Sequence, residues 1–264
     1  MTEASYPLPN RFERPSVVSF ALYIFIAWFV VVSFSGAGIS LSNFIEGIPN
    51  MGTLLSEMFP PKMDRLGAIG KALLETFQMA IGGTILGVIL SVPLGVFASR
   101  TQSPHVLVYR FTRLLISFFR SVPDLVWALF FVATVGLGPF AGTLALMIDT
   151  IGFCARFFAE AIEEINSGPQ EALTAIGANR TSRLFCSVFP AAMPSFTNTA
   201  MYSLEKATRS SVVLGLVGAG GIGIELKVSM DMFRYAEAST IILFIFLLVV
   251  AVETLSTKIR QKLM

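Results

Sequence analysis

The stretch EALTAIGANRTSRLFCSVFP (Glu171–Pro190) is a polar interval between two strongly apolar segments of the chain. Pro169 precedes it, and proline suits the first turn of a helix because the N–H that it lacks would be unpaired there. Glu171 falls in the same turn, where its carboxylate can reach back to free backbone N–H groups. Gly177 fits the left-handed residue that ends a helix, and Asn179 can cap a second one. The interval therefore predicts a helix, a sharp glycine turn and a second helix, which together form a rigid projection.

The composition is that of a membrane protein. Of the 264 residues 54% are hydrophobic and 14% charged, and the mean hydropathy is +0.73. Soluble domains carry about 25% charged residues. The net charge of +2 gives no indication of a nucleic-acid partner. Cys154 and Cys186 are expected to be free thiols rather than a disulfide.

Apolar windows predict an all-α polytopic membrane protein with about six transmembrane helices. A span needs roughly 20 mainly apolar residues. Windows of this kind lie at about 17–36, 72–98, 111–135, 139–161, 191–217 and 237–257. The segment 37–70 is too interrupted to span, since Pro49, Pro60 and Pro61 are expected to break it. We interpret it as an external loop that contains an interfacial amphipathic element.

Lys and Arg residues favour cytoplasmic locations for both termini. With the N-terminus inside, the inside segments hold 11 of the 19 basic residues and the outside segments hold 5, while Arg120, Lys206 and Arg209 lie within spans. The predicted organisation is a cytoplasmic tail at 1–16, a first transmembrane helix at 17–36, an external loop at 37–70, and a transmembrane domain at 71–264. The polar loop 166–190 of that domain would then lie in the cytoplasm.

Two predicted helices carry rows of small residues at a spacing of four, which lets helices approach closely in lipid. The rows are Gly83, Gly87, Ser91 and Gly95, and then Ser195, Thr199, Ser203, Ala207, Ser211 and Gly215. They predict a tightly packed bundle.

The spacing of Glu171, Ala172, Gly177 and Pro190 matches the EAA loop of ABC-importer permeases, and the chain therefore resembles that family. The departures are mild: Leu173 replaces the second alanine, Ser187 an isoleucine and Phe189 a leucine. The EAA loop is specific for importer permeases, and the resemblance covers most of Lys71–Leu263. Three further segments look like the phosphonate/phosphite branch rather than relatives for methionine or glycine betaine: Phe119–Leu146, Phe158–Ala178 and Ser210–Gly223.

The resemblance implies a methionine-permease-like bundle in a bacterial cytoplasmic (inner) membrane, which works with partner proteins. These are a second copy of the chain, two cytoplasmic ABC ATPase subunits and an external solute-binding protein, in a lipid bilayer and without nucleic acid. The chain would bind no cofactor directly, because it contains no G-x-x-x-x-G-K-[ST] motif and ATP and Mg would belong to the ATPase. It would be a transport subunit rather than an enzyme. The ATPase-coupling residues would be Glu171, Ala172, Leu173, Ile176, Gly177 and Pro190.

A glycine-rich segment contains Gly218, Gly220, Gly221 and Gly223, which literally satisfy G-x-G-x-x-G. A dinucleotide site needs a βαβ unit around this motif, and an apolar span precedes it instead. We expect close backbone approach and sharp turns here. The resemblance puts the segment at the external end of the pathway.

Ionisable residues inside spans are costly and usually face a pathway or a partner. Six are present: Arg120, Asp124, Asp149, Glu205, Lys206 and Arg209. Arg120/Asp124 and Glu205/Arg209 are four residues apart, so each pair could meet on one helix face. Two interpretations remain open: a self-neutralising network, or a free Arg120 or Arg209 that attracts an anion. Glu160, Glu163 and Glu164 are interpreted as a solvated helix end.

Other functions are less favoured. A permease for methionine or betaine would share the EAA loop. A membrane-embedded enzyme lacks support, because the sequence shows no Ser/His, paired-Asp or H-E-x-x-H constellation. A passive anion channel would leave the projection unexplained.

Overall fold

The computed structural model describes residues 16–38 and 40–263, and these residues form helices and connecting turns with no strand among them. The chain divides into two compact units, 1–56 and 57–264. The predicted tail 1–16, with Arg11 and Arg14, lies outside the described residues except for Ser16.

The first unit contains helix α1 (Val17–Gly36) and most of α2 (Leu41–Met58). Ser16 caps α1, because its hydroxyl accepts a hydrogen bond from the Ser19 N–H at 3.2 Å. The expected break at Pro49 is wrong, since Pro49 lies inside α2. The single Pro49 removes one backbone hydrogen bond, which a helix can tolerate, whereas the consecutive prolines 60 and 61 remove two in a row and disfavour helical geometry at two successive preceding residues. The helix therefore ends just before that pair.

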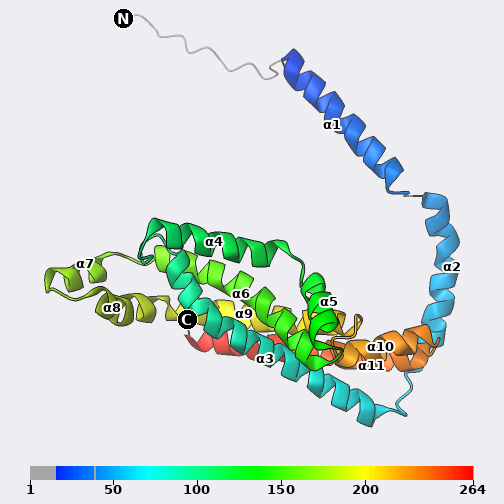
Figure 1. Ribbon diagram of the computed structural model, residues 1–264. Helices are drawn as coiled ribbons and strands as arrows, with labels where there is room; N and C mark the ends of the chain where they lie inside the picture. Colours follow the sequence, from blue (N-terminus) through cyan, green and yellow to red (C-terminus); the bar gives the residue numbers. More distant parts are fainter. Residues whose placement is uncertain (1–15, 39, 264) are drawn as a thin grey trace, which may run out of the picture. The chain divides into compact units, whose positions relative to one another are not determined.

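The second unit is a helical bundle, and Figure 1 shows α7 and α8 projecting from one end of it, with α5 and α10 at the other. Its elements are α3 (Leu66–Ala98), α4 (Val106–Ser121), α5 (Asp124–Val135), α6 (Pro139–Glu163), α7 (Gly168–Ala175), α8 (Arg180–Arg183), a π-helical turn (Leu184–Val188), α9 (Phe189–Gly215), α10 (Ile222–Asp231) and α11 (Tyr235–Leu263).

Three of the described helices, α1, α3 and α11, are long and apolar enough to cross a membrane. The pair α4 and α5 adds a fourth if the two count as one span. Helices α6 and α9 have 25 and 27 residues, which exceeds the roughly 20 that a bilayer requires, but they carry several ionisable side chains. A polytopic membrane fold is therefore present, and the count of six spans stays a prediction.

The window 111–135 is not one straight helix, which corrects the prediction. Helices α4 and α5 meet at an angle of 88°. Pro123 lies at the break, and its ring keeps Val122 in an extended conformation with ψ of 120°. The direction of the chain therefore changes between Ser121 and Asp124.

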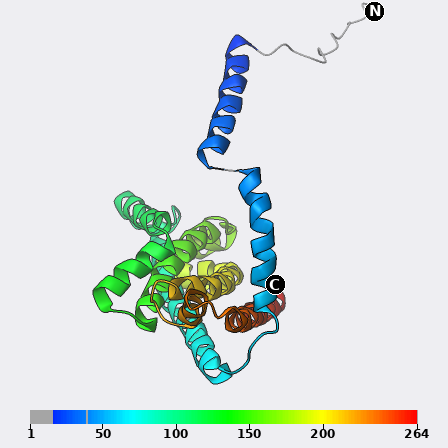
Figure 2. The same cartoon turned by 90° about the vertical axis from the view of Figure 1, so that its right-hand side faces the viewer.

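Helix α6 packs against α3, α4, α5 and α9 and is thus the centre of the bundle. Figure 2 views the bundle from the end that carries α10. The small residues of α3 pack on it: a Cβ atom added to Gly83 would lie 2.6 Å from Leu146 Cβ, and one added to Gly95 would lie 2.7 Å from Phe158 Cβ. This row therefore mediates close helix packing, as predicted.

The row on α9 is buried only in its second half. Ser203, Ala207, Ser211 and Gly215 are buried, whereas Ser195 is exposed and Thr199 half-buried. The prediction of tight packing is thus confirmed for the half of α9 that lies away from α7 and α8.

Candidate functional site

The projection formed by α7 and α8 ends its first helix with a glycine motif. Gly177 has φ of +82°, the left-handed region that suits glycine. The Ala178 N–H donates to Leu173 O at 2.9 Å, and the Gly177 N–H donates to Thr174 O at 3.0 Å. These two bonds are the Schellman arrangement, which satisfies the last carbonyl groups of α7. The predicted glycine turn is therefore present.

The start of α7 differs slightly from the prediction. Ser167 precedes the helix, and Glu171 accepts a hydrogen bond from the Ser167 hydroxyl at 2.5 Å rather than from backbone N–H groups. The reason is that Glu171 lies one residue deeper in the helix than expected, so the serine side chain is nearer to its carboxylate. At the second helix Asn179 caps as expected, since its Oδ1 accepts from the Ser182 N–H at 2.7 Å.

Side chains hold the two helices of the projection together. Arg183 Nη1 donates to Thr174 Oγ1 at 2.9 Å, and the Thr174 hydroxyl donates to Gln170 O at 2.7 Å. This chain of bonds joins α8 to the middle and start of α7. The projection is therefore internally braced.

The projection is also held to the loop between α3 and α4. Gln170 Oε1 accepts from Gln102 Nε2 at 2.9 Å, and the Arg180 guanidinium donates to Gln102 O. Gln102 is buried although it lies in a loop. Movement of the projection would therefore reach α3 and α4 as well as α6 and α9. The sequence analysis missed this contact, because Gln102 and Gln170 are far apart in the chain and form no motif.

The second helix of the projection continues directly into α9. The π-helical turn Leu184–Val188 joins them, and Pro190 lies in the first turn of α9. Proline has no N–H for the preceding turn and its ring crowds the carbonyl four residues earlier, so a widened turn accommodates it. Pro190 thus lies where the projection joins the long helix.

The outer surface of the projection carries most of the predicted coupling residues. Glu171, Ala172, Ile176 and Gly177 are exposed, Leu173 is half-buried, and the Ile176 side chain is 79% exposed. A large aliphatic side chain at the tip of a rigid polar projection is suited to a partner's apolar groove.

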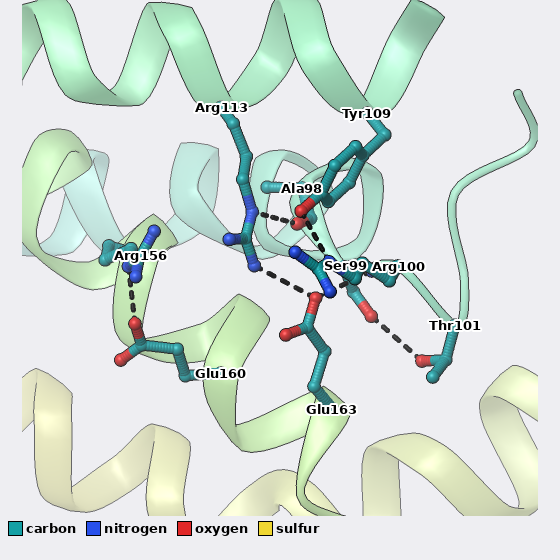
Figure 3. A network of polar contacts seen from close by, with 9 residues as sticks. All are labelled: Ala98, Ser99, Arg100, Thr101, Tyr109, Arg113, Arg156, Glu160 and Glu163. Atoms are coloured by element: carbon teal, nitrogen blue, oxygen red, sulfur yellow. Dashed lines mark hydrogen bonds and ion pairs between the residues drawn. The ribbon is translucent and has the colours of Figure 1, made fainter. Parts of the chain in front are cut away.

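At the base of the projection Glu163 holds three elements together, as Figure 3 shows. It accepts from Arg113 Nη2 at 3.0 Å and from the Arg100 N–H at 2.7 Å, while Arg113 Nε donates to Ala98 O at 3.0 Å. The end of α6 is thereby joined to α4 and to the end of α3. Glu163 was expected to be a solvated residue, and this interpretation is wrong. The guanidinium of Arg113 in α4 and the backbone N–H of Arg100 in the loop after α3 face it, which the spacing within one helix does not reveal.

The same region contains two further contacts. Arg156 pairs with Glu160 at 2.5 Å along α6. Arg100 Nε donates to Tyr109 Oη at 2.9 Å, and this bond, followed by the charge of Glu163, raises the pKa of the Arg100 guanidinium above its ordinary value. Arg100 is therefore a permanent positive charge.

Two ionisable residues of α9 pair with other helices rather than with each other. Lys206 Nζ donates to both carboxylate oxygens of Asp149 in α6, at 2.7 and 2.8 Å. Glu205, 7% exposed, accepts from Arg260 of α11 at 2.8 Å. The suggested Glu205/Arg209 pair therefore does not form, because Arg260 of a different helix binds the Glu205 carboxylate.

The expected Arg120/Asp124 pair is also wrong. Arg120 lies in the last turn of α4 and Asp124 begins α5, so the 88° bend separates them. Asp124 instead accepts from the Leu125 N–H at 2.9 Å. Arg120 and Arg209 are both exposed, and no ion pair is recorded for either among residues 16–38 and 40–263.

The glycine-rich segment packs its backbone against α3 and α6. Gly218, Gly220 and Gly221 have φ of +91°, +91° and +74°. The Gly221 N–H donates to Glu75 Oε1 at 2.8 Å, and the Ile222 N–H donates to Thr76 Oγ1 at 2.7 Å. A Cβ atom on Gly223 would lie 2.1 Å from Val212 O. The segment thus makes sharp turns and close backbone contacts, and helices surround it instead of a βαβ unit.

Comparisons with known proteins agree with this architecture. Residues 91–263 match the family model described as binding-protein-dependent transport system inner membrane component. The phosphite transport system permease protein PtxC of Stutzerimonas stutzeri is 35% identical over 92% of this chain and 86% of its own length. The phosphate-import permease protein PhnE of Mycolicibacterium smegmatis is 37% identical over 98% of this chain, which spans about half (48%) of that longer protein.

Among solved structures, an inward-facing MetNI methionine ABC transporter chain superposes with a TM-score of 0.67, at 24% identity. The match covers 77% of this chain and 99% of that one, and it shows a shared fold. The chain belongs to the family of inner membrane components of binding-protein-dependent transport systems, as a multi-pass permease of the ABC importer type.

Proposed function

We propose that the chain is the permease subunit of an ATP-driven importer for phosphonate, phosphite or a related small phosphorus oxyanion. The observation that carries the proposal is the braced projection Glu171–Pro190 on a chain whose full-length relatives include a phosphite permease. Such a projection is a rigid element that a separate ATPase can bind and move. The charge pattern of the described bundle agrees with an anionic solute, because Arg120 and Arg209 are exposed without a carboxylate partner.

The proposed complex contains two copies of this chain, two cytoplasmic ATPase subunits and an external binding protein. A bundle of this size encloses no pathway alone, and a two-fold axis would place one between two copies. The ATPase would hold ATP and Mg, and this chain would perform no catalysis. Both termini and the projection would be cytoplasmic, and the glycine-rich segment external.

In the proposed mechanism, closure of the ATPase dimer on ATP moves the two projections inward. Gln102 passes this movement to α3 and α4, and the π-helical turn passes it to α9. The bundles tilt and open outward, the anion enters from the binding protein, and hydrolysis restores the inward-facing state. The exposed guanidinium groups attract the anion without enclosing it, which allows release.

The proposal is tested by uptake into membrane vesicles that hold this chain with the ATPase and binding protein that co-purify with it. We expect saturable uptake of phosphite or methylphosphonate that requires ATP hydrolysis. Equal uptake without nucleotide would instead indicate a channel. ATP-driven uptake of methionine or glycine betaine, with none of either phosphorus anion, would assign the chain to another branch.

Replacing Arg209 by Gln tests the pathway. A hydrogen bond to a charged group contributes about 1.5–3 kcal/mol, so uptake at limiting anion should fall by roughly tenfold or more. Basal ATPase activity, measured separately, should persist. Arg209→Lys should retain part of the uptake, and Lys258→Gln, the same change of charge at an exposed position of α11, should retain all of it. Unchanged uptake by an assembled Arg209→Gln complex would remove Arg209 from the pathway.

A further inference from the structure

A cavity with several polar side chains in its lining lies where the loop after α3 meets the first turns of α4. Its volume is about 370 Å³, and its polar lining comes from Arg100, Ser103, His105, Tyr109 and Arg110. His105 Nδ1 accepts from the Leu107 N–H at 3.1 Å, which caps α4 and leaves Nε2 to carry the ring's donor hydrogen. The lining is therefore rich in hydrogen-bond donors.

The charge around this cavity is positive. Arg100, Arg110 and Arg113 belong to this end of the bundle, and the nearby carboxylate, Glu163, pairs with Arg113. Glu163 also accepts from the backbone of Arg100, not from its guanidinium (Figure 3). Among the residues that the structure describes, no ion pair is recorded for the guanidinium groups of Arg100 and Arg110. Two guanidinium groups that form no direct ion pair among the described residues thus line the cavity.

An apolar surface begins beside the cavity and follows α4. Leu107, Phe111, Leu114 and Phe118 are 68%, 67%, 70% and 54% exposed. Their spacing of four, three and four residues puts them on one face of the helix. Arg110, one turn before Leu114, joins this face to the cavity. A donor-rich cationic cavity is therefore continuous with an exposed apolar stripe.

We propose that this end of α4 binds an anionic phospholipid, with the headgroup phosphate between Arg100 and Arg110 and the acyl chains along the apolar stripe. A basic pocket at the membrane border of a helix suits such headgroups. Inorganic phosphate complements the cavity alone, whereas a phospholipid complements both surfaces. Helical spacing puts this stripe on the face of α4 opposite to Arg120. The proposal therefore does not depend on which anion the importer carries.

The test is titration of the detergent-purified full chain with phosphatidylglycerol and, separately, with phosphatidylcholine. Native mass spectrometry counts the bound lipid and gives the Kd of the first molecule. We expect phosphatidylglycerol to bind more tightly than phosphatidylcholine. Arg100→Gln and Arg110→Gln should each raise the Kd for phosphatidylglycerol by about fivefold. Each basic residue near an anionic headgroup contributes about 1 kcal/mol to binding, which corresponds to that factor. Phosphatidylcholine binding should change little.

Matched variants separate charge from folding. Arg110→Lys keeps the charge and should retain tight binding, and Lys258→Gln removes an exposed charge from α11 and should have no effect. Equal binding of the two lipids by the unmodified chain would overturn the proposal. Displacement of phosphatidylglycerol by inorganic phosphate would also overturn it and would indicate a site for a free anion. Displacement of the lipid by the bound ATPase would overturn it as well and would indicate a protein contact.

Discussion

Replacing Ile176 by Asp is expected to abolish association with the ATPase and, with it, ATP-dependent uptake. Ile176 is 79% exposed at the tip of the projection, so the substitution costs the isolated chain little. In the complex the same position would be buried, and an unpaired carboxylate is expensive to bury. Central apolar contacts of an interface contribute about 2 kcal/mol or more, which weakens binding by at least roughly thirtyfold. Co-purification with the ATPase and uptake into vesicles measure the two effects.

A control for this result lies at the opposite end of the bundle. Phe233, 76% exposed after α10, can be replaced by Asp with the same change in charge and polarity, and the ATPase should still co-purify. Thermal unfolding of both variants should match the unmodified chain. An Ile176→Asp chain that binds the ATPase normally would contradict the coupling role of the projection.

Replacing Gly87 by Ala is expected to destabilise the bundle by about 1–3 kcal/mol, the usual cost of overpacking. The added Cβ would lie 2.5 Å from Thr150 Cβ and 3.0 Å from Met147 O. Both atoms lie in or next to the backbone of α6 and cannot rotate away. The clash is therefore relieved only if α3 and α6 move apart. Thermal unfolding of the purified chain measures the loss.

Gly82, on the same helix, provides the matched control. A Cβ at Gly82 would meet only Thr143 Cγ2, at an ordinary 3.4 Å. Gly82→Ala should therefore be neutral or stabilise the helix by up to about 1 kcal/mol, since alanine is the better helix former. If both variants unfold alike, contact between α3 and α6 at Gly87 is not a source of stability.

Local chemistry allowed much of the projection to be predicted. Asn179 and Gly177 each form a hydrogen bond with a backbone group three residues away, so their roles follow from neighbouring sequence. The small-residue row of α3 was likewise predictable, because a spacing of four marks one face of a helix. The family resemblance then indicated what such a projection is for.

The errors about ionisable side chains share a physical origin, because the spacing argument considered only contacts along one continuous helix. Pro123 bends the chain and parts Arg120 from Asp124. Glu205 pairs with Arg260, 55 residues later in the sequence. Glu163 likewise meets Arg113 from α4, 50 residues earlier. Contacts of this kind depend on how helices pack, which helical periodicity does not determine.

The close fit of α3 on α6 also restricts how the protein can move. Thr150, Leu146 and Phe158 are seated against successive glycines of α3. A slide by one residue, about 1.5 Å, would drive these side chains into the neighbouring turns. Helices α3 and α6 are therefore expected to move together as one rigid body. Changes of shape during a transport cycle would then fall outside this helix pair, for example at the bend before Asp124.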